Sequence, residues 1–274
     1  MPSPVITLTT DFGWTELPAA MRGVIRQLAP PGTEVVDLNH TVPPHNIIQG
    51  AYSMLTVCPI FRGAIHVGVV DPGVGTNRRA IAIACEGAMF VGPDNGLLIP
   101  AANKFGIKEV RQVTNREYTL RRASYVFHGR DIFAPVAAHL SKGAKMRELG
   151  PAIEDYVNLD FWTPQADEAG IRGEVLTVDR FGNIVTNISR AAVSERWRFN
   201  QDFDVSIGEF EIRLRLLRTY GEAGEGDILA TISSSGFLEI SRRNGAAAET
   251  LRVTARSPVA IRPAPAEASP RPCA

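Results

Sequence analysis

The chain has 274 residues and balances 29 Lys and Arg against 29 Asp and Glu, so its formal net charge at pH 7 is zero. Because nucleic-acid-binding proteins usually carry a basic excess, this balance disfavours a nucleic-acid partner and an anionic membrane surface. A hydrophobic content of 45% with 21% charged residues excludes disorder over the whole length and is typical of one or two globular domains.

The first seventy residues predict a β-α-β-α-β pattern, because short apolar runs alternate with segments of helical spacing. Strands are expected at 5–9, 34–38 and 64–70, and helices at 19–29 and 47–57. Continuous apolar strands separated by helices are typical of a parallel sheet covered on both faces. Later elements of the same region are strands expected at 79–84, 89–91 and 108–113 and a helix at 131–141.

The pattern of apolar and polar residues changes after Pro151. Residues 151–171 show no clear period and are interpreted as a linker. Short runs separated by turns then predict a small barrel or sandwich, with strands at 174–178, 184–187, 204–207, 210–217, 228–232, 237–240 and 251–255. We therefore expect an α/β N-terminal domain with a largely parallel sheet over 1–165, a small all-β, barrel-like domain over 166–262 and a disordered tail over 263–274.

The cysteines and histidines show no metal-ligand spacing. Cys58, Cys85 and Cys273 stand far apart, which argues against a zinc cluster and a disulfide scaffold. No metal site is expected from the histidines either. The first residues lack the pattern of a signal peptide, and no run of about 18 apolar residues exists, so no membrane span is expected. Together these features favour a cytoplasmic protein.

Acidic, basic and imidazole side chains recur where the predicted strands and helices join. Asp11 follows the first strand, and Asp71 and Arg78 lie in the segment after the third. Asp94 follows a later strand, and His128 precedes the last predicted helix. Because ligands of open α/β sheets bind beyond the carboxyl ends of the strands, these residues are candidates for a functional site.

Each candidate also has an ordinary structural interpretation. Asp11 and Asp71 can be turn residues, and Arg78 a solvated surface charge. His128 can be a partly buried core histidine, and Asp94-Asn95-Gly96 is interpreted as a hairpin turn.

Neither common nucleotide-binding motif is present. The segment DPGVGT at 71–76 lacks the lysine of a phosphate-binding loop, and no GxGxxG follows the first strand. The sequence therefore does not support binding of ATP or NAD.

Six segments, taken in order, resemble one family. They are TLTTDFG, VVDPGVGTNRR, VGPDNG, FHGRDIFAPVAAHL, DRFGNIVTNI and SSSGFLEIS, and they extend over about residues 6–255. This order is similar to that of the S-adenosylmethionine (SAM) hydroxide adenosyltransferases, which are related to fluorinases and chlorinases. The resemblance implies hydrolysis of SAM to adenosine and L-methionine by attack of water or hydroxide at ribose C5′, without cofactor or metal. It also implies a homotrimer in which each ligand lies between the N-terminal domain of one subunit and the C-terminal domain of its neighbour.

The same resemblance assigns residues by their motifs. Asp71, Arg78 and His128 form the implied catalytic set. Substrate-binding residues implied in the first domain are Asp11, for the ribose hydroxyls, with Glu16 and Phe127. In the second domain it implies Asp179 for the methionine amino group, Phe181 and Asn183 for adenine, Ser234 and Ser235 for the methionine carboxylate, and Arg242 or Arg243 near adenine.

The chain departs from its family at a few positions. The family often has Asp where this chain has Glu16 and Asn46. Halogenases carry Tyr at the place of Asp71, so the Asp71, Arg78 and His128 set favours water. Gly129, at the halide-contacting place, does not by itself exclude chloride. Two alternatives stay open, namely a halide adenosyltransferase that forms 5′-halo-adenosine and a non-catalytic protein that binds SAM or adenosine.

Overall fold

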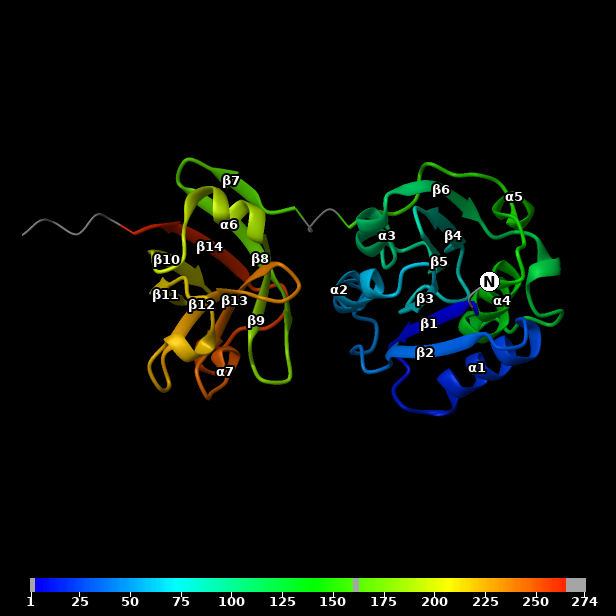
Figure 1. The fold of residues 1–274 in the computed structure, drawn as a ribbon, viewed down its shortest axis with the longest axis horizontal. Helices are drawn as coiled ribbons and strands as arrows, with labels where there is room; N and C mark the ends of the chain where they lie inside the picture. Colours follow the sequence, from blue (N-terminus) through cyan, green and yellow to red (C-terminus); the bar gives the residue numbers. More distant parts are fainter. Residues whose placement is uncertain (1–2, 160–162, 265–274) are drawn as a thin grey trace, which may run out of the picture. The chain divides into compact units, whose positions relative to one another are not determined.

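The computed structural model describes residues 3–159 and 163–264, and the chain divides into two compact units between residues 159 and 160 (Figure 1). Of the predicted tail over 263–274, residues 265–274 lie outside the described residues. Within the described residues, no helix has the length and hydropathy that crossing a membrane would require.

A mixed sheet forms the centre of the N-terminal unit. Its strands are β1 (Val5–Thr10), β2 (Glu34–Asn39), β3 (Ile65–Val69), β4 (Ala80–Cys85), β5 (Ala88–Pro93) and β6 (Ile107–Gln112). The order across the sheet is β2-β1-β3-β5-β4-β6. Neighbours from β2 to β5 are parallel, whereas β4 runs antiparallel to both β5 and β6. The prediction of a largely parallel sheet is confirmed.

Helices cover both faces of this sheet (Figure 1). They are α1 (Glu16–Leu28), α2 (Ile47–Val57), α3 (Ile99–Phe105), α4 (Ala134–Ser141) and α5 (Met146–Leu149). Helix α1 contacts α4, and α2 contacts α3. On the α1 and α4 face, Met21 and Val136 pack with Leu8 in a fully buried core. Each such side chain stabilises the fold by about 1.5–3 kcal/mol relative to its exposed state.

The predicted hairpin turn at Asp94-Asn95-Gly96 is wrong. These residues connect β5 to α3, and the following strand, β6, pairs with β4 rather than with β5. The Asp94 side chain is 2% exposed and lies 2.7 Å from Nη2 of Arg79, so this acidic residue fixes a buried connection instead of a solvated turn.

The C-terminal unit is an antiparallel, nearly closed barrel. Its strands are β7 (Gln165–Asp167), β8 (Gly170–Val178), β9 (Ile184–Ser189), β10 (Asp202–Ile207), β11 (Phe210–Arg215), β12 (Ile228–Ile232), β13 (Phe237–Arg242) and β14 (Pro258–Pro263). The order is β11-β10-β14-β8-β9-β13-β12, with β7 paired to β8. A bridge between Leu216 and Ala230 connects the two ends of this order. The prediction of a small all-β, barrel-like fold is confirmed.

Two predictions for this region need correction. The expected linker over 151–171 contains β7 and the start of β8, which pair with each other. The expected strand over 251–255 is absent, because Leu251 ends helix α7 (Ala247–Leu251) and the last strand starts at Pro258. Leu251 and Val253 are buried in the barrel core, so their alternation reflects packing without strand pairing. A further short helix, α6 (Arg190–Arg196), follows β9.

Candidate active site

Three of the residues singled out in the sequence form one hydrogen-bonded cluster in the N-terminal unit. The Arg78 guanidinium donates from Nε to Oδ1 of Asp71 at 3.0 Å and from Nη2 to Oδ2 of the same carboxylate. Nη2 also lies 2.9 Å from Nδ1 of His128. The side chains of Arg78 and Asp71 are only 8% and 5% exposed, so this is a largely buried, bidentate ion pair.

The contact with Arg78 fixes the tautomer of His128. A guanidinium has donors and no acceptor, so Nδ1 of His128 must be the accepting nitrogen and the ring proton sits on Nε2. Burial, and then the adjacent Arg78 charge, lower the pKa of His128 below its ordinary value. The imidazole is therefore neutral near pH 7 and presents an N–H donor from Nε2.

Local backbone structure brings the cluster together. Asp71 follows β3, and its carbonyl accepts a hydrogen bond from Val74 N at 3.2 Å, which starts a tight turn. Gly75 adopts a φ of 80°, and a Cβ built there would lie 2.8 Å from the Tyr125 carbonyl oxygen, so glycine is required at this close approach. His128 directly precedes a π-helical turn at Gly129–Phe133, a backbone irregularity that is frequent at functional sites.

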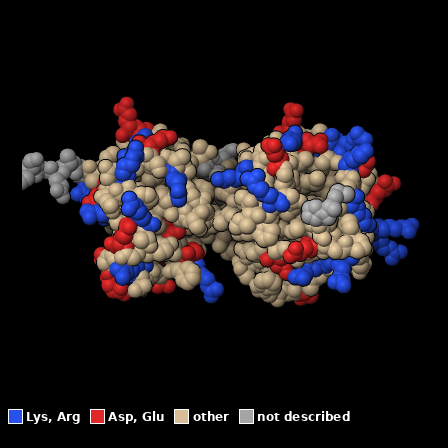
Figure 2. Space-filling model, viewed as in Figure 1, with Lys and Arg blue, Asp and Glu red and all other residues tan. Residues whose placement is uncertain are grey.

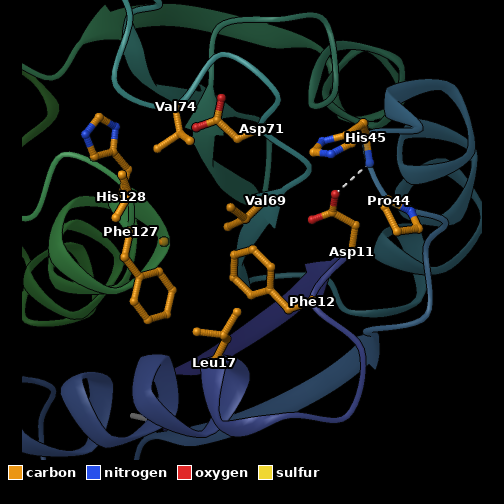
Figure 3. Close-up of a pocket in the computed structure, with 12 residues that line it drawn as sticks. Asp11, Phe12, Leu17, Pro44, His45, Val69, Asp71, Val74, Phe127 and His128 are labelled. Atoms are coloured by element: carbon orange, nitrogen blue, oxygen red, sulfur yellow. Dashed lines mark hydrogen bonds between the residues drawn. The ribbon is translucent and has the colours of Figure 1, made fainter.

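Asp71 and His128 lie on the wall of a pocket of about 480 Å³ in the same unit. Figure 3 shows His128 on one side of the pocket, Asp11 and His45 on the other, and Asp71 between them. The lining residues are Asp11, Phe12, Leu17, Pro44, His45, Val69, Asp71, Val74, Val126, Phe127, His128 and Gly129. A mostly apolar wall with a few polar groups is typical of a small-molecule site.

Asp11 is tied to the opposite loop of the pocket. Its Oδ2 accepts a hydrogen bond from the backbone N–H of His45 at 2.8 Å (Figure 3). His45 adopts a left-handed backbone with a φ of 65°, a conformation that costs free energy and is enriched at functional sites. The rings of Phe12 and Phe127 meet edge to face, with centroids 5.7 Å apart.

Sequence reasoning located some pocket residues and missed others. Asp11 and Phe127, both expected to bind substrate, line the pocket, whereas Glu16 is exposed at the start of α1, next to the lining residue Leu17. Phe12 and His45 were not predicted. The position of Phe12 directly after Asp11 was an available signal, but no pattern in the sequence marks His45.

A second group of predicted residues lines a groove of about 690 Å³ in the C-terminal unit. Its lining residues are Asp179, Phe181, Asn183, Tyr220, Gly221, Arg242, Arg243, Asn244 and Gly245. Phe181 is 72% exposed, so its ring is available for stacking on a flat ligand. Tyr220 was not predicted; its hydroxyl donates to the buried carboxylate of Glu239 at 2.6 Å.

Most polar groups of this groove already have protein partners. Oδ1 of Asp179 accepts from the backbone N–H groups of Phe181 and Asn183, at 2.8 and 2.9 Å. Arg242 donates from Nε to the Gly226 carbonyl at 2.9 Å, and Arg243 donates from Nη1 to the carbonyl of Ala223. These bonds fix the shape of the groove, while a carboxylate such as Asp179 retains further acceptor positions.

The predicted serines lie outside the residues that line the groove. Ser234 is exposed in the turn between β12 and β13, and the Ser235 hydroxyl lies 2.8 Å from that of Ser233. Among the described residues, no group of three or more His, Cys, Asp or Glu side chains is arranged to hold a metal ion.

Comparisons with known proteins cover nearly the whole chain. The sequence profile of the SAM hydroxide adenosyltransferase N-terminal domain matches residues 6–150, and that of the C-terminal domain matches residues 173–260. A protein from Salinispora tropica named (R)-S-adenosyl-L-methionine hydrolase is 39% identical, over 92% of this chain and 95% of its own. A fluorinase from Actinopolyspora mzabensis is 27% identical, over 87% and 90%. The crystal structure of an uncharacterized conserved protein from Thermotoga maritima is similar with a TM-score of 0.87 at 33% identity, over 94% of this chain and 99% of that one.

Proposed function

The chain belongs to the SAM hydroxide adenosyltransferase family, and from this premise we propose that it hydrolyses SAM to adenosine and L-methionine by attack of water or hydroxide on ribose C5′. The observation that carries the proposal is the hydrogen-bonded Asp71–Arg78–His128 cluster, two of whose members lie on the pocket wall. It supplies several hydrogen-bond donors for an oxygen nucleophile.

Departure of the leaving group needs little assistance from the protein. A sulfonium departs as a neutral thioether, so no general acid is needed. The nucleophile must instead be held in line with the C5′–S bond, and such positioning can lower the barrier by several kcal/mol. If hydroxide attacks, its charge and that of the sulfonium cancel in the transition state, so the apolar walls of the pocket favour the reaction.

The hydrogen bonds of the cluster suit a nucleophile-holding role. Nε2–H of His128 donates to the nucleophilic oxygen, because Nδ1 is occupied by Arg78. Nη1 of Arg78 is buried without a hydrogen-bond partner among the described residues, so it is free to donate as well. The positive guanidinium stabilises hydroxide character on the oxygen, and Asp71 keeps the guanidinium in place.

Several further predicted residues line the pocket or the groove. In the N-terminal unit, the Asp11 carboxylate accepts hydrogen bonds from the ribose hydroxyl groups, and Phe127 contributes an apolar wall. In the C-terminal unit, Phe181 stacks on adenine, and the Asn183 side chain forms hydrogen bonds with the edge of the adenine ring. Asp179 binds the methionine ammonium group, which needs an anionic partner.

The same proposal covers the rest of the substrate and the assembly. Ser234 and Ser235 approach the methionine carboxylate, and Glu16 approaches the methionine ammonium group. Arg242 or Arg243 lies near adenine. The enzyme uses no cofactor and no metal, works in the cytoplasm, and forms a homotrimer in which the pocket of one subunit and the groove of its neighbour hold one ligand. Figure 2 shows acidic and basic side chains interspersed on the visible face, which agrees with a small ligand bound by local groups rather than a polyanion.

Isotope labelling tests the reaction directly. The purified protein is incubated with SAM in ¹⁸O-labelled water, in chloride buffer and in a buffer with an inert anion, and the products are analysed by mass spectrometry. Adenosine labelled at the 5′-oxygen in both buffers supports hydrolysis. Chloride-dependent 5′-chloroadenosine would identify a halide adenosyltransferase, and retention of SAM without products would identify a binding protein. S-adenosylhomocysteine would indicate methyl transfer and overturn the proposal.

A further inference from the structure

His40 follows β2 and is fully buried beside the loop that carries Asp11 and Phe12. Its Nδ1 lies 2.9 Å from the hydroxyl of Thr10, the last residue of β1. Its Nε2 lies 3.1 Å from Oδ1 of Asp37, and Asp37 also binds the Arg22 guanidinium of α1. Neither Nε2 nor Oδ1 has a well-aligned hydrogen bond among the described residues, so this contact compensates the burial of both.

A β-bulge places His40 in this position. The parallel register of β1 and β2 pairs Leu8 with Asp37 and then Thr9 with Asn39, so one extra residue, Leu38, is inserted in β2. Without the insertion, Asn39 would lie level with Thr10. The shift brings His40 there instead, and bulges next to functional sites commonly redirect a side chain in this way.

The hydrogen bonds form a directional chain that ends on the pocket loop. The backbone N–H of Phe12 donates to Oγ1 of Thr10 at 3.2 Å. The 3.1 Å contact between Nε2 of His40 and the Asp37 carboxylate favours the tautomer with the proton on Nε2, and in that tautomer Nδ1 accepts a hydrogen bond from the Thr10 hydroxyl. Separately, the backbone N–H of Gly13 donates to the His40 carbonyl at 2.7 Å.

These bonds hold both ends of the turn from Asp11 to Gly13. The turn directs Asp11 and Phe12 to the pocket wall, and Gly13 adopts a φ of 67° within it. His40 itself does not line the pocket, so its influence on a ligand must pass through the turn.

We propose that His40, through Thr10, is a positioning residue that fixes Asp11 and Phe12 for ligand binding. The proposal rests on the proposed function for the identity of the ligand, SAM or its adenosine part. It predicts that disrupting the chain weakens binding through the turn, beyond any effect of lost stability.

The chain contains a matched control on the opposite face of the same strand. Thr7 of β1 is also buried, and its hydroxyl lies 2.8 Å from Nδ1 of a second buried histidine, His66. His66 packs against the rings of Phe90 and Phe105 and not against the pocket. Thr7→Val and Thr10→Val therefore each remove a threonine–histidine bond from the same strand. Thr10→Val also removes the acceptor of the Phe12 N–H group, and only the bonds of Thr10 support the turn.

The experiment compares Thr10→Val, Thr10→Ser and Thr7→Val in the full chain. The thermal unfolding midpoint reports the structural cost, initial rates give KM and kcat for SAM, and calorimetry gives the dissociation constant of adenosine. We expect both valine variants to lower the midpoint, and Thr10→Val to lower it somewhat more because the Thr10 hydroxyl makes two hydrogen bonds. Thr10→Val should raise KM and the adenosine dissociation constant by about fivefold to tenfold, because these two bonds position the turn, with a smaller change in kcat. Thr10→Ser should restore both constants, and Thr7→Val should change them by less than about twofold.

Equal effects of Thr7→Val and Thr10→Val on ligand binding, or no rescue by serine, would overturn the positioning role. Failure of the proposed function is distinguishable, because it would appear as adenosine binding by the wild-type chain without hydrolysis of SAM. In that case the comparison of adenosine affinities still decides whether the Thr10 hydroxyl, with its bonds to His40 and Phe12, positions the turn. If the wild-type chain binds neither adenosine nor SAM, the positioning role is overturned together with the proposed function.

Discussion

Nη2 of Arg78 is 2.9 Å from Nδ1 of His128 while the same guanidinium holds both carboxylate oxygens of Asp71. One arginine thus sets the orientation of both the imidazole and the carboxylate. This arrangement gives the two neighbours defined hydrogen-bonding roles and makes the three side chains one unit.

Arg78→Lys tests whether the cluster needs a planar guanidinium group that binds through two nitrogens. A lysine keeps the positive charge but cannot bind Asp71 in a bidentate manner and reach His128 together. We expect kcat for SAM hydrolysis to fall on the order of 100-fold, with adenosine affinity changed much less. Arg79→Lys is the matched control, because Arg79 pairs with Asp94 and Asp155 rather than with the cluster. A kcat for Arg78→Lys equal to that of Arg79→Lys would contradict the assigned role.

His128→Ala and Asp71→Ala test whether the cluster acts as a unit. Each substitution should lower turnover on the order of 100-fold, because each leaves the others wrongly oriented. The double variant should be little worse than the more damaged single variant, since effects within one unit are not additive. Single-turnover rates of the three variants check this, and fully multiplicative losses would show that the two residues act independently.

The pH dependence of turnover follows from the lowered pKa of His128. Burial and the Arg78 charge favour the neutral ring, so protonation needs a pH below the ordinary value of about 6.5. Protonated His128 cannot accept from Arg78 and places a second positive charge in the cluster. The contribution of this group to stability is likewise complete above about 6.5 and is lost as the pH falls through the lowered pKa.

We therefore expect kcat/KM to have an acid limb with its midpoint below about 6.5. The profile of His128→Gln, measured over the same range, should lack this limb at its lower overall rate. A limb that persists in His128→Gln would assign the titration to another group.

The sequence predicted the sheet of the N-terminal unit because its strands and first two helices have distinct periods. Helix α3 was missed because five of its seven residues are buried, which removes the alternation that marks a surface helix. The Asp94 turn was misinterpreted since its composition is that of a hairpin, whereas burial against Arg79 decides the fold there.

The candidate site was predictable as far as motif order reaches. Asp71, Arg78 and His128 lie 57 positions apart at most, and hydrogen bonds join the three side chains in the structure, while their catalytic role stays a prediction. His45 was not predictable, because its place in the pocket depends on a left-handed backbone and a bond to Asp11. Neither the left-handed backbone nor the bond to Asp11 produces a recognisable pattern in the sequence.

Phe181→Ala tests the C-terminal groove as an adenine site. The exposed ring should stack on the base, and base–aromatic stacking is worth about 1–3 kcal/mol, so the adenosine dissociation constant should rise about tenfold. Phe199→Ala is the control, because Phe199 is also exposed but lies outside the groove lining and faces Arg218. Calorimetric titration of both variants with adenosine measures the difference. Equal affinities would remove Phe181 from the site.

Asp94→Ala and Asp155→Ala compare two carboxylates that bind the same arginine. Oδ2 of Asp94 accepts from Nε of Arg79 and Oδ1 accepts from the backbone N–H of Val157, both at 2.8 Å, whereas Asp155 meets Arg79 at the surface. Their side chains are 2% and 79% exposed.

Asp94→Ala leaves Arg79 with only its exposed partner Asp155 and removes the acceptor of the Val157 N–H group, so it should lower the free energy of unfolding by about 2–3 kcal/mol. Asp155→Ala should have little effect, because exposed ion pairs contribute little. Urea denaturation at neutral pH measures both free energies. Equal destabilisation of the two variants would contradict this prediction. It would mean that the exposed Arg79–Asp155 pair, and not the buried Asp94 contact, holds residues 155–157 at the end of β5.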